Sequence, residues 1–489
     1  MRDPVARVHT VFFELLIWAK KIPTWEDRMD FPLRPASNVL LESVDRLAQF
    51  AAHTRLPDIP QPVLSRVKAI IADTVAVIAA GMQVAELKAL CRSHLPRVAA
   101  GPCTVIGAKQ RTNRLDAALL NGTAGVWQDF DEGNLYMHGH PGIQVIPAAI
   151  ACAEEHGMTG ADLLAAVAVG YEACGRVSGA SRMKQIIHPH GTFGTIGAAI
   201  AASRLGGFDP ERMRGLINLA ASIPMANNRH AMLHGGTIRN WGAGYSGYMG
   251  QLAVRLAEAG FAAAPDAVNT VYASVLGDAF DPLQMVDGLG SRWLLTDGYI
   301  KLYPTGRYSH AAMDALIDVL ERLPGRRLDP AAVVRIEVNT FRLGAMLDVR
   351  TVKNVFNSRF SIPFALASII YHGRCGLDCF EEAAVANPVI QSLAQRTDVV
   401  EDPGLEARYP REQIADLAIH LTSGQVLRGR CEVMRGDPGN PHDPRDLERK
   451  FYELTEPVLG RPSSERLYEG LMSLERIADV RAFTLESGL

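Results

Sequence analysis

The feature that most constrains this chain is a helical pattern, rich in Ala, Leu and Val, that runs from about residue 40 to about residue 270. Helix-start signals punctuate it. Thr159 stands three residues before Asp162 and ahead of an apolar run, and Asp209-Pro210 offers an N-cap followed by a first-turn proline. Alanine side chains are small enough to let such helices approach closely. The pattern therefore predicts a compact all-helical body.

The pattern changes near residue 299. Asp329-Pro330 opens a short helical segment that leads into residues 334–338, where apolar residues alternate as in a strand with one solvated face. Residues 416–421 and 425–430 flank a Thr-Ser-Gly turn and predict a hairpin. Asp443-Pro444 then starts further helices.

These signals predict a mainly α fold with a smaller α+β domain. We expect an N-terminal extension over residues 1–42, a helical domain over 43–298, an α+β domain over 299–434, and C-terminal helices over 435–489 that return to the helical domain.

Composition excludes several classes of function. With 50 basic and 53 acidic residues the formal net charge is -3, which argues against nucleic acid as a partner. No window reaches the length of apolar chain that a membrane span needs, and the short apolar patch at residues 11–18 is expected to be an amphipathic helix or a frayed arm rather than an export signal.

An odd number of cysteines, seven, fits a reduced, cytoplasmic setting. Cys375 and Cys379 form a close pair, but a second pair that would complete a zinc site is missing.

Histidine is the informative residue type, because seven of the fourteen histidines fall between His138 and His234, in glycine-rich segments. Asp129, Asp131 and Glu132 precede His138 and His140. Three interpretations stay open for these residues: a metal site, an acid/base site, or a polar loop whose acids cap helices. The spacing matches no known metal signature.

A second polar segment, residues 301–310, carries Lys301, Tyr303, Arg307 and His310. It is either an anion-binding edge, with Arg307 suited to a bidentate carboxylate contact, or an ordinary solvated loop before a helix over residues 311–317. Dinucleotide, P-loop and nucleophile-elbow motifs are absent from the sequence. Carboxylates and histidines with scattered cations suit proton transfer on a carboxylate substrate.

Several ordered segments resemble the MmgE/PrpD family. Residues 121–132 followed by His140-Pro-Gly142 resemble the family's "NGxxxHxxDFDD…HPG" signature, and residues 188–197 resemble "HPTSTFGxxG". Residues 301–310 resemble "KPYPxCRxxH", and residues 361–364 resemble "FSxPY". The family includes 2-methylcitrate dehydratases, cis-aconitate decarboxylases and iminodisuccinate epimerases.

The resemblance implies a helical body capped by an α+β lid with the site between them, a homodimer, and no metal or organic cofactor. It also implies the site residues: Asp129, His140, His188 and Lys301 as catalytic, and Arg239, Arg307, His310 and Tyr303 as substrate-binding.

Departures from the family's motifs bear on the substrate. Val126 stands where many members have histidine, Glu132 replaces the second aspartate of the signature, Gly133 stands where some members have threonine, Arg239 replaces a lysine, and Phe364 lacks a tyrosine hydroxyl.

The sequence predicts a cofactor-independent lyase for a small di- or tricarboxylate. In this hypothesis Arg239 and Lys301 hold carboxylates, Asp129 orients a histidine, and His140 and His188 divide the roles of base and acid. A (2-methyl)citrate-type dehydratase or hydratase is favoured. The alternatives are a cis-aconitate-type decarboxylase, an iminodisuccinate-type epimerase, and a non-catalytic carboxylate-binding protein on the same fold.

Overall fold

The computed structural model describes residues 37–489, and Val39–Leu489 form one compact unit. The expected helix at residues 11–18 lies outside this range. Between residues 37 and 489, none of the helices combines the length and the apolarity that crossing a bilayer requires.

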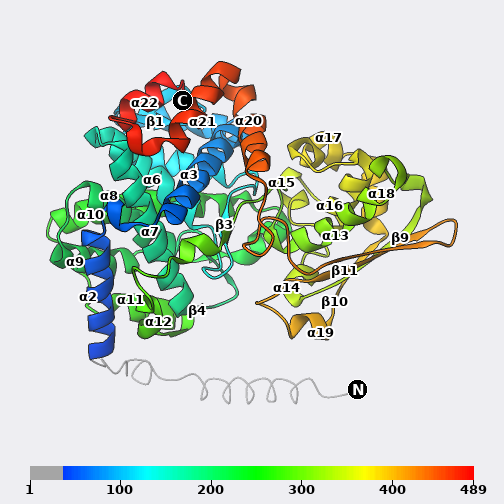
Figure 1. The fold of residues 1–489 in the computed structure, drawn as a ribbon, viewed down its shortest axis with the longest axis horizontal. Helices are drawn as coiled ribbons and strands as arrows, with labels where there is room; N and C mark the ends of the chain where they lie inside the picture. Colours follow the sequence, from blue (N-terminus) through cyan, green and yellow to red (C-terminus); the bar gives the residue numbers. More distant parts are fainter. Residues whose placement is uncertain (1–36) are drawn as a thin grey trace, which may run out of the picture. The chain divides into compact units, whose positions relative to one another are not determined.

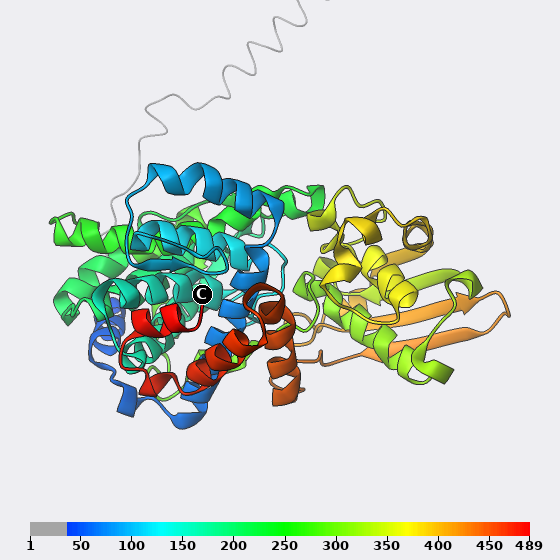
Figure 2. The same cartoon turned by 90° about the horizontal axis from the view of Figure 1, so that it is seen from above.

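Closely packed helices make up the first half of this unit (Figures 1 and 2). They are α2 (Asn38–His53), α3 (Gln61–Gly81), α4 (Ala85–His94), α5 (Arg114–Gly125), α6 (Pro141–His156), α7 (Gly160–Ala180), α8 (Phe193–Leu205), α9 (Pro210–Ala221), α10 (Trp241–Glu258), α11 (Ala267–Thr270) and α12 (Pro282–Val286). Small residues allow the close approach that the sequence predicts: a Cβ added at Gly122 of α5 would lie 2.8 Å from the Cα of Gly244 of α10.

The predicted helix starts are confirmed. Thr159 caps α7 by accepting a hydrogen bond from the backbone N–H of Asp162, whose carboxylate accepts in return from the Thr159 N–H. Asp209 caps α9 in the same way through the N–H of Arg212, and Pro210 occupies the first turn.

Between residues 310 and 431 helices cover a four-stranded sheet of order β10-β9-β11-β12. The strands are β9 (Val333–Thr340), β10 (Thr397–Glu401), β11 (Ala415–Leu421) and β12 (Val426–Cys431). The helices are α13 (His310–Glu321), α14 (Arg342–Ala345), α15 (Val355–Ser358), α16 (Ile362–His372), α17 (Glu382–Val385), α18 (Pro388–Gln395) and α19 (Pro403–Glu406). The predicted hairpin is confirmed as the antiparallel pair β11 and β12.

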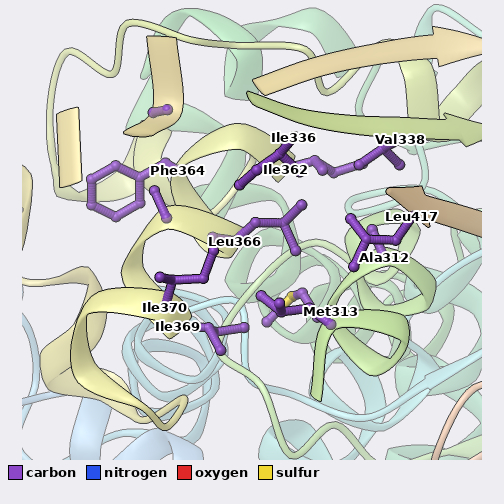
Figure 3. Close-up of a cluster of buried hydrophobic side chains, with 14 of the residues drawn as sticks. Ala312, Met313, Ile336, Val338, Ile362, Phe364, Leu366, Ile369, Ile370 and Leu417 are labelled. Atoms are coloured by element: carbon purple, nitrogen blue, oxygen red, sulfur yellow. The ribbon is translucent and has the colours of Figure 1, made fainter. Parts of the chain in front are cut away.

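A separate apolar core holds this region together (Figure 3). Ile336 and Val338 of β9 point into it beside Leu417 of β11, with Met313 of α13 and Leu366 of α16 on the helix side. Each fully buried aliphatic side chain of this kind contributes about 1.5–3 kcal/mol relative to an exposed one. Val334, which the alternation assigns to the same face, is instead 49% exposed, and the register between β9 and β11 shifts opposite it, at His420 and Leu421.

Very short antiparallel pairs join distant segments of the chain. Besides β1 (Cys103–Val105) with β2 (Gln110–Thr112) and β4 (Ser181–Met183) with β7 (Gly277–Phe280), β3 (Gly133–Asn134) pairs with β8 (Gly298–Tyr299), and β5 (Ile187–His188) pairs with β6 (Asn227–Asn228). The β3–β8 pair brings residues 126–132, which we call the acid-rich loop, close to Lys301. The β5–β6 pair brings His188 close to Arg229 and Arg239.

The last helices, α20 (Pro444–Leu459), α21 (Arg461–Met472) and α22 (Val480–Glu486), pack against α3 and α6, as the orange and red ribbons beside the blue one show in Figures 1 and 2. Lys450 of α20 is buried, forms an ion pair with Asp73 of α3 at 2.5 Å, and donates to the backbone carbonyl of Phe130 at 2.7 Å. The C-terminal helix α20 thus contacts the acid-rich loop through Lys450. We propose that domain boundaries fall near residues 43, 299 and 435.

Candidate active site

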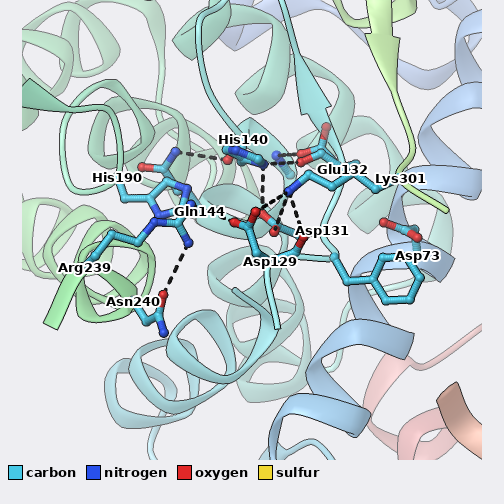
Figure 4. Close-up of polar contacts among 12 residues, drawn as sticks. Asp73, Asp129, Asp131, Glu132, His140, Gln144, His190, Arg239, Asn240 and Lys301 are labelled. Carbon is cyan, nitrogen blue, oxygen red and sulfur yellow. Dashed lines mark hydrogen bonds and ion pairs between the residues drawn. The ribbon is translucent and has the colours of Figure 1, made fainter. Parts of the chain in front are cut away.

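Asp129 lies at the centre of a buried polar cluster (Figure 4). It adopts a left-handed backbone conformation, with φ of 49°, in the loop that follows α5. Its Oδ1 accepts from Nη2 of Arg239 at 2.9 Å, and its Oδ2 lies 3.2 Å from Nζ of Lys301. Burial disfavours its ionised form, but Lys301 and Arg239 outweigh burial and hold the pKa of the Asp129 carboxyl below its usual value.

Asp131, not Asp129, is the carboxylate partner of His140. Its Oδ2 lies 3.0 Å from Nδ1 of His140, which also lies 2.6 Å from the backbone carbonyl oxygen of Glu132. The Glu132 carbonyl can only accept a hydrogen bond, so Nδ1 carries the proton, with the Asp131 carboxylate as its ion-pair partner, and Nε2 is left to handle a second proton. Although burial opposes it, His140 and Lys301 lower the pKa of the Asp131 carboxyl, which keeps it ionised.

His188 is held neutral. Nε of Arg239 donates to its Nε2 at 3.1 Å, and burial together with Arg239 lowers its pKa well below the usual value. With its lone pair occupied by a guanidinium, His188 is poorly placed to serve as an acid.

His190 is fully buried between the other two imidazoles, edge to face, with ring centroids 5.2 Å from His140 and 4.5 Å from His188. Within residues 37–489 neither of its ring nitrogens has a hydrogen-bond partner. Burial and Arg239 lower its pKa well below the usual value. We call Asp129, Asp131, His140, His188, His190, Arg239 and Lys301 the acid–histidine cluster.

Glu132 stays protonated near neutral pH. It is fully buried and accepts from the backbone N–H of Gly142 at 2.5 Å and from the Tyr171 hydroxyl at 3.0 Å. Burial, and secondarily Asp131, raises its pKa to about 8.

Lys301 lies behind the two aspartates rather than in the cavity wall. Its side chain is 0% exposed, and Nζ also donates to the backbone carbonyl of Asp129 at 2.9 Å. This position differs from the expectation that Lys301 holds a substrate carboxylate directly. Its charge acts on the site through Asp129 and Asp131.

Arg307 and His310 of segment 301–310 belong to a second cluster, whose side chains mainly contact one another. Arg307 forms an ion pair with Asp437, its Nη1 donates to Nδ1 of His310 at 3.1 Å, and its guanidinium stacks 4.2 Å above the Tyr299 ring. Nε2 of His310 donates to the Thr305 carbonyl at 3.3 Å. We call Tyr299, Arg307, His310 and Asp437 the Arg307 cluster.

A cavity of about 90 Å³ lies beside both clusters. Its polar lining includes Asp129, His138, His140, His188, Arg229, Arg239, Arg307 and Gln413, and its apolar lining includes Met232, Leu347, Phe360, Tyr299, Tyr308 and Tyr409. His310 and Tyr303 are not part of this lining. The Tyr303 hydroxyl donates to Asp314 at 2.7 Å, and Tyr303 lines another cavity.

Two members of the cluster were not among the predicted site residues: Asp131, which entered only through the metal hypothesis, and His190. Each stands two positions after a predicted residue, Asp129 or His188. That repeat is the only signal in the sequence that could have found them.

Among the described residues, Asp131, His140 and His190 are the group that could hold a metal ion, with ligand atoms within 4.8 Å of one another. The Lys301 ammonium, 3.9 Å from Oδ1 of Asp131, opposes a divalent cation there by charge repulsion. His138, the other histidine of the metal hypothesis, lies outside this group.

Two of the family departures lie away from the cavity. Phe364 is fully buried in the apolar core around α16, and Val126 is buried at the end of α5. At Gly133 a Cβ would lie 2.4 Å from the Tyr299 hydroxyl, so the close approach of Tyr299 requires glycine here.

The chain is similar in sequence to known proteins over most of its length. The sequence pattern of the MmgE/PrpD N-terminal domain matches residues 45–276, and that of the C-terminal domain matches residues 303–475. The chain is 23% identical to a cis-aconitate decarboxylase of Aspergillus terreus, over 91% of this chain and 95% of the relative. It is 26% identical to the cis-aconitate decarboxylase of Homo sapiens, over 75% and 78% of the two chains, and 23% identical to a cis-aconitate decarboxylase-like protein of Aspergillus oryzae, over 91% and 96%.

Proposed function

Because the chain belongs to the MmgE/PrpD family, we propose that it is a lyase that acts on a small polycarboxylate, and that it decarboxylates an acid of the cis-aconitate type. Motif resemblance alone favours dehydration and keeps decarboxylation as the alternative. The names of the relatives and the chemistry available in the cavity favour that alternative.

One observation carries the proposal: His140 lines the cavity with its Nδ1 engaged by Asp131 and its Nε2 available. An aspartate on the far nitrogen fixes the tautomer and stabilises the imidazolium, so Nε2 can deliver a proton to a substrate atom. His138 and His188 also line the cavity, but desolvation and nearby arginines lower the pKa of both.

Decarboxylation needs one proton transfer. The bond between the departing carboxylate and its carbon breaks, and its electron pair forms a new C=C bond as the original double bond shifts. Negative charge then develops on the carbon beside another carboxylate. Arg239, in the cavity wall, stabilises this enolate-like charge, and His140 protonates the carbon from Nε2. The products are CO₂ and itaconate, and His140 regains its proton from solvent.

Dehydration needs two proton handlers: a base for the carbon-bound proton and an acid for the departing hydroxide. His188, the second histidine predicted for this pair, is neutral, and its Nε2 is engaged by Arg239. This difference favours decarboxylation over the dehydratase hypothesis.

The test is incubation of the full chain with cis-aconitate in D₂O, followed by NMR and CO₂ detection. We expect CO₂ release and one deuterium in the saturated CH₂ group of itaconate, which is the carbon that His140 protonates. Parallel reactions with citrate and 2-methylcitrate test dehydration. Water loss from either acid without CO₂ release from cis-aconitate would overturn the proposal in favour of the dehydratase. Binding of all three acids without turnover or deuterium exchange would favour a non-catalytic protein.

Homodimer formation and independence of metals are part of the same proposal. Light scattering after gel filtration measures the mass of the assembly. Activity that persists after dialysis against a chelator would support a reaction run by side chains alone, whereas loss of activity restored by one divalent ion would point to the Asp131, His140 and His190 group.

A further inference from the structure

Three arginines line the cavity: Arg229, Arg239 and Arg307. Two of them are already neutralised by a carboxylate, Arg239 by Asp129 and Arg307 by Asp437. Arg229 has no acidic partner anywhere in residues 37–489. Its Nε and Nη2 donate only to the backbone carbonyl of Ile187, at 3.4 and 3.2 Å.

Local structure fixes where this guanidinium lies. Arg229 directly follows β6, whose partner β5 contains Ile187 and His188. The backbone N–H of Arg229 also donates to the carbonyl of Ile186 at 2.8 Å. Backbone and side chain are therefore both anchored to the strand that carries His188, and the half-buried guanidinium keeps Nη1 free for another partner.

Charges around the cavity leave one cation uncompensated. Arg229, Arg239, Arg307 and Lys301 face three carboxylates, those of Asp129, Asp131 and Asp437. Glu132 does not change this balance near neutral pH, since its pKa is raised to about 8. The excess charge belongs to Arg229, and a ligand carboxylate is the natural group to balance it.

We propose that Arg229 is a specificity-determining residue that binds a second carboxylate of the substrate, separate from the part of the molecule that reacts at His140. The inference rests on the proposed function and deepens it, because it restricts the substrate class to acids with at least two carboxylates. An arginine suits this task since its planar donors can bind a carboxylate through two hydrogen bonds.

Arg229 has free donors and lies outside the family motifs quoted above. The same chemistry would also attract phosphate, so the test includes both anions. A carboxylate site is favoured because the aromatic walls of Tyr308 and Tyr409 enclose the cavity and suit a compact organic acid better than a strongly hydrated inorganic anion.

The test uses the full chain with Arg229→Gln and Arg229→Lys. Arg255→Gln is the matched control, because Arg255 is an exposed arginine of α10 outside the cavity lining. Calorimetric titration with propane-1,2,3-tricarboxylate, which has no double bond to react, measures binding independently of turnover. Titration with butyrate, a monocarboxylate, and with inorganic phosphate completes the set.

We expect Arg229→Gln to weaken tricarboxylate binding about 10- to 100-fold, as loss of a charge-assisted pair of hydrogen bonds implies, and to leave butyrate binding within about twofold. Arg229→Lys should recover part of the loss, and Arg255→Gln should change nothing. With cis-aconitate the same variant should raise KM far more than it lowers kcat.

Unchanged tricarboxylate affinity in Arg229→Gln would overturn the inference, and so would an equal loss for butyrate. Phosphate binding that depends on Arg229 without any dependence for the tricarboxylate would overturn it as well. Failure of the proposed decarboxylation is a separate result, because it appears as absence of CO₂ release by the unmodified protein while these binding differences persist.

Discussion

The acid–histidine cluster and the Arg307 cluster have similar compositions but opposite hydrogen-bonding states. In the Arg307 cluster the guanidinium is bound by Asp437, His310 and the Tyr299 ring, and both nitrogens of His310 have partners. Among the described residues Nε of Arg307 has no hydrogen-bond partner. In the acid–histidine cluster both nitrogens of His190 lack partners among the described residues, and Nε2 of His140 is available at the cavity.

Arginine and histidine close to a cavity do not by themselves make a reactive site. A saturated network braces the fold, since its groups lose a partner if they turn to a ligand. An unsaturated one has donors and acceptors left for a substrate.

The largest expected effect is that of His140→Gln. Glutamine keeps a polar group but cannot transfer the proton, so kcat should fall about 10²- to 10⁴-fold. His310→Gln in the Arg307 cluster is the matched control and should leave kcat within a few-fold. Steady-state kinetics with cis-aconitate measures both. Equal losses in the two variants would show that the contrast between the clusters has no functional meaning.

Asp131→Asn should reduce kcat about 10- to 100-fold, because the amide removes the charge that stabilises the His140 imidazolium while keeping its shape. It should also move the alkaline limb of the pH–rate profile to lower pH, because the reaction needs the protonated ring and the ring loses its proton more readily without the Asp131 charge. The control is Asp437→Asn, which breaks the ion pair with Arg307 and should lower stability while leaving the pH–rate profile in place. An unshifted profile in Asp131→Asn would count against the dyad.

Leucine substitutions should separate the clusters in stability. His310→Leu leaves the Thr305 carbonyl without a buried partner and leaves Nη1 of Arg307 only the Arg435 carbonyl at 3.4 Å, at a cost of about 1–3 kcal/mol. His190→Leu removes two nitrogens that have no partner within the described residues, so its free energy of unfolding should be unchanged or higher. Urea unfolding compares them. A strong destabilisation by His190→Leu would mean that His190 has a partner such as bound water.

The last comparison concerns the pH dependence of stability. In the folded protein the pKa of Glu132 is raised from 4.5 to about 8, so this group's contribution is fully present below about pH 4.5 and is lost as pH rises towards 8. The slope attributable to Glu132 is at most about 1.4 kcal/mol per pH unit. Unfolding curves at several pH values should show a shallower decline for Glu132→Gln than for the unmodified chain. Parallel declines would contradict a protonated Glu132.

Much of the fold follows from local sequence. Thr159 with Asp162 and Asp209 with Pro210 predict the starts of α7 and α9, and alternation with a turn predicts β9 and the β11–β12 hairpin. These features depend on residues within a few positions of one another, so periodicity and capping chemistry report them directly. The ordered motifs also indicate the family, which the matches over residues 45–276 and 303–475 confirm.

Other features were decided by tertiary structure. Two-residue ladders such as β3–β8 and β5–β6 are too short to leave a periodic signal, yet they bring Lys301 to the acid-rich loop and Arg229 to His188. Contacts between distant residues decide the geometry of the site. Arg239 contacts Asp129 from 110 positions away, and Lys301 contacts the Asp129 carbonyl from 172 positions away.

Local sequence patterns therefore predict the helical body, the α+β region, the family and the types of residue gathered at the site. Contacts between distant segments set which of those residues already have partners and which, His140 and Arg229 foremost, retain donors or acceptors for a substrate. The physical reason is that a hydrogen bond depends on distance and direction between two groups, and a linear pattern of residue types contains neither.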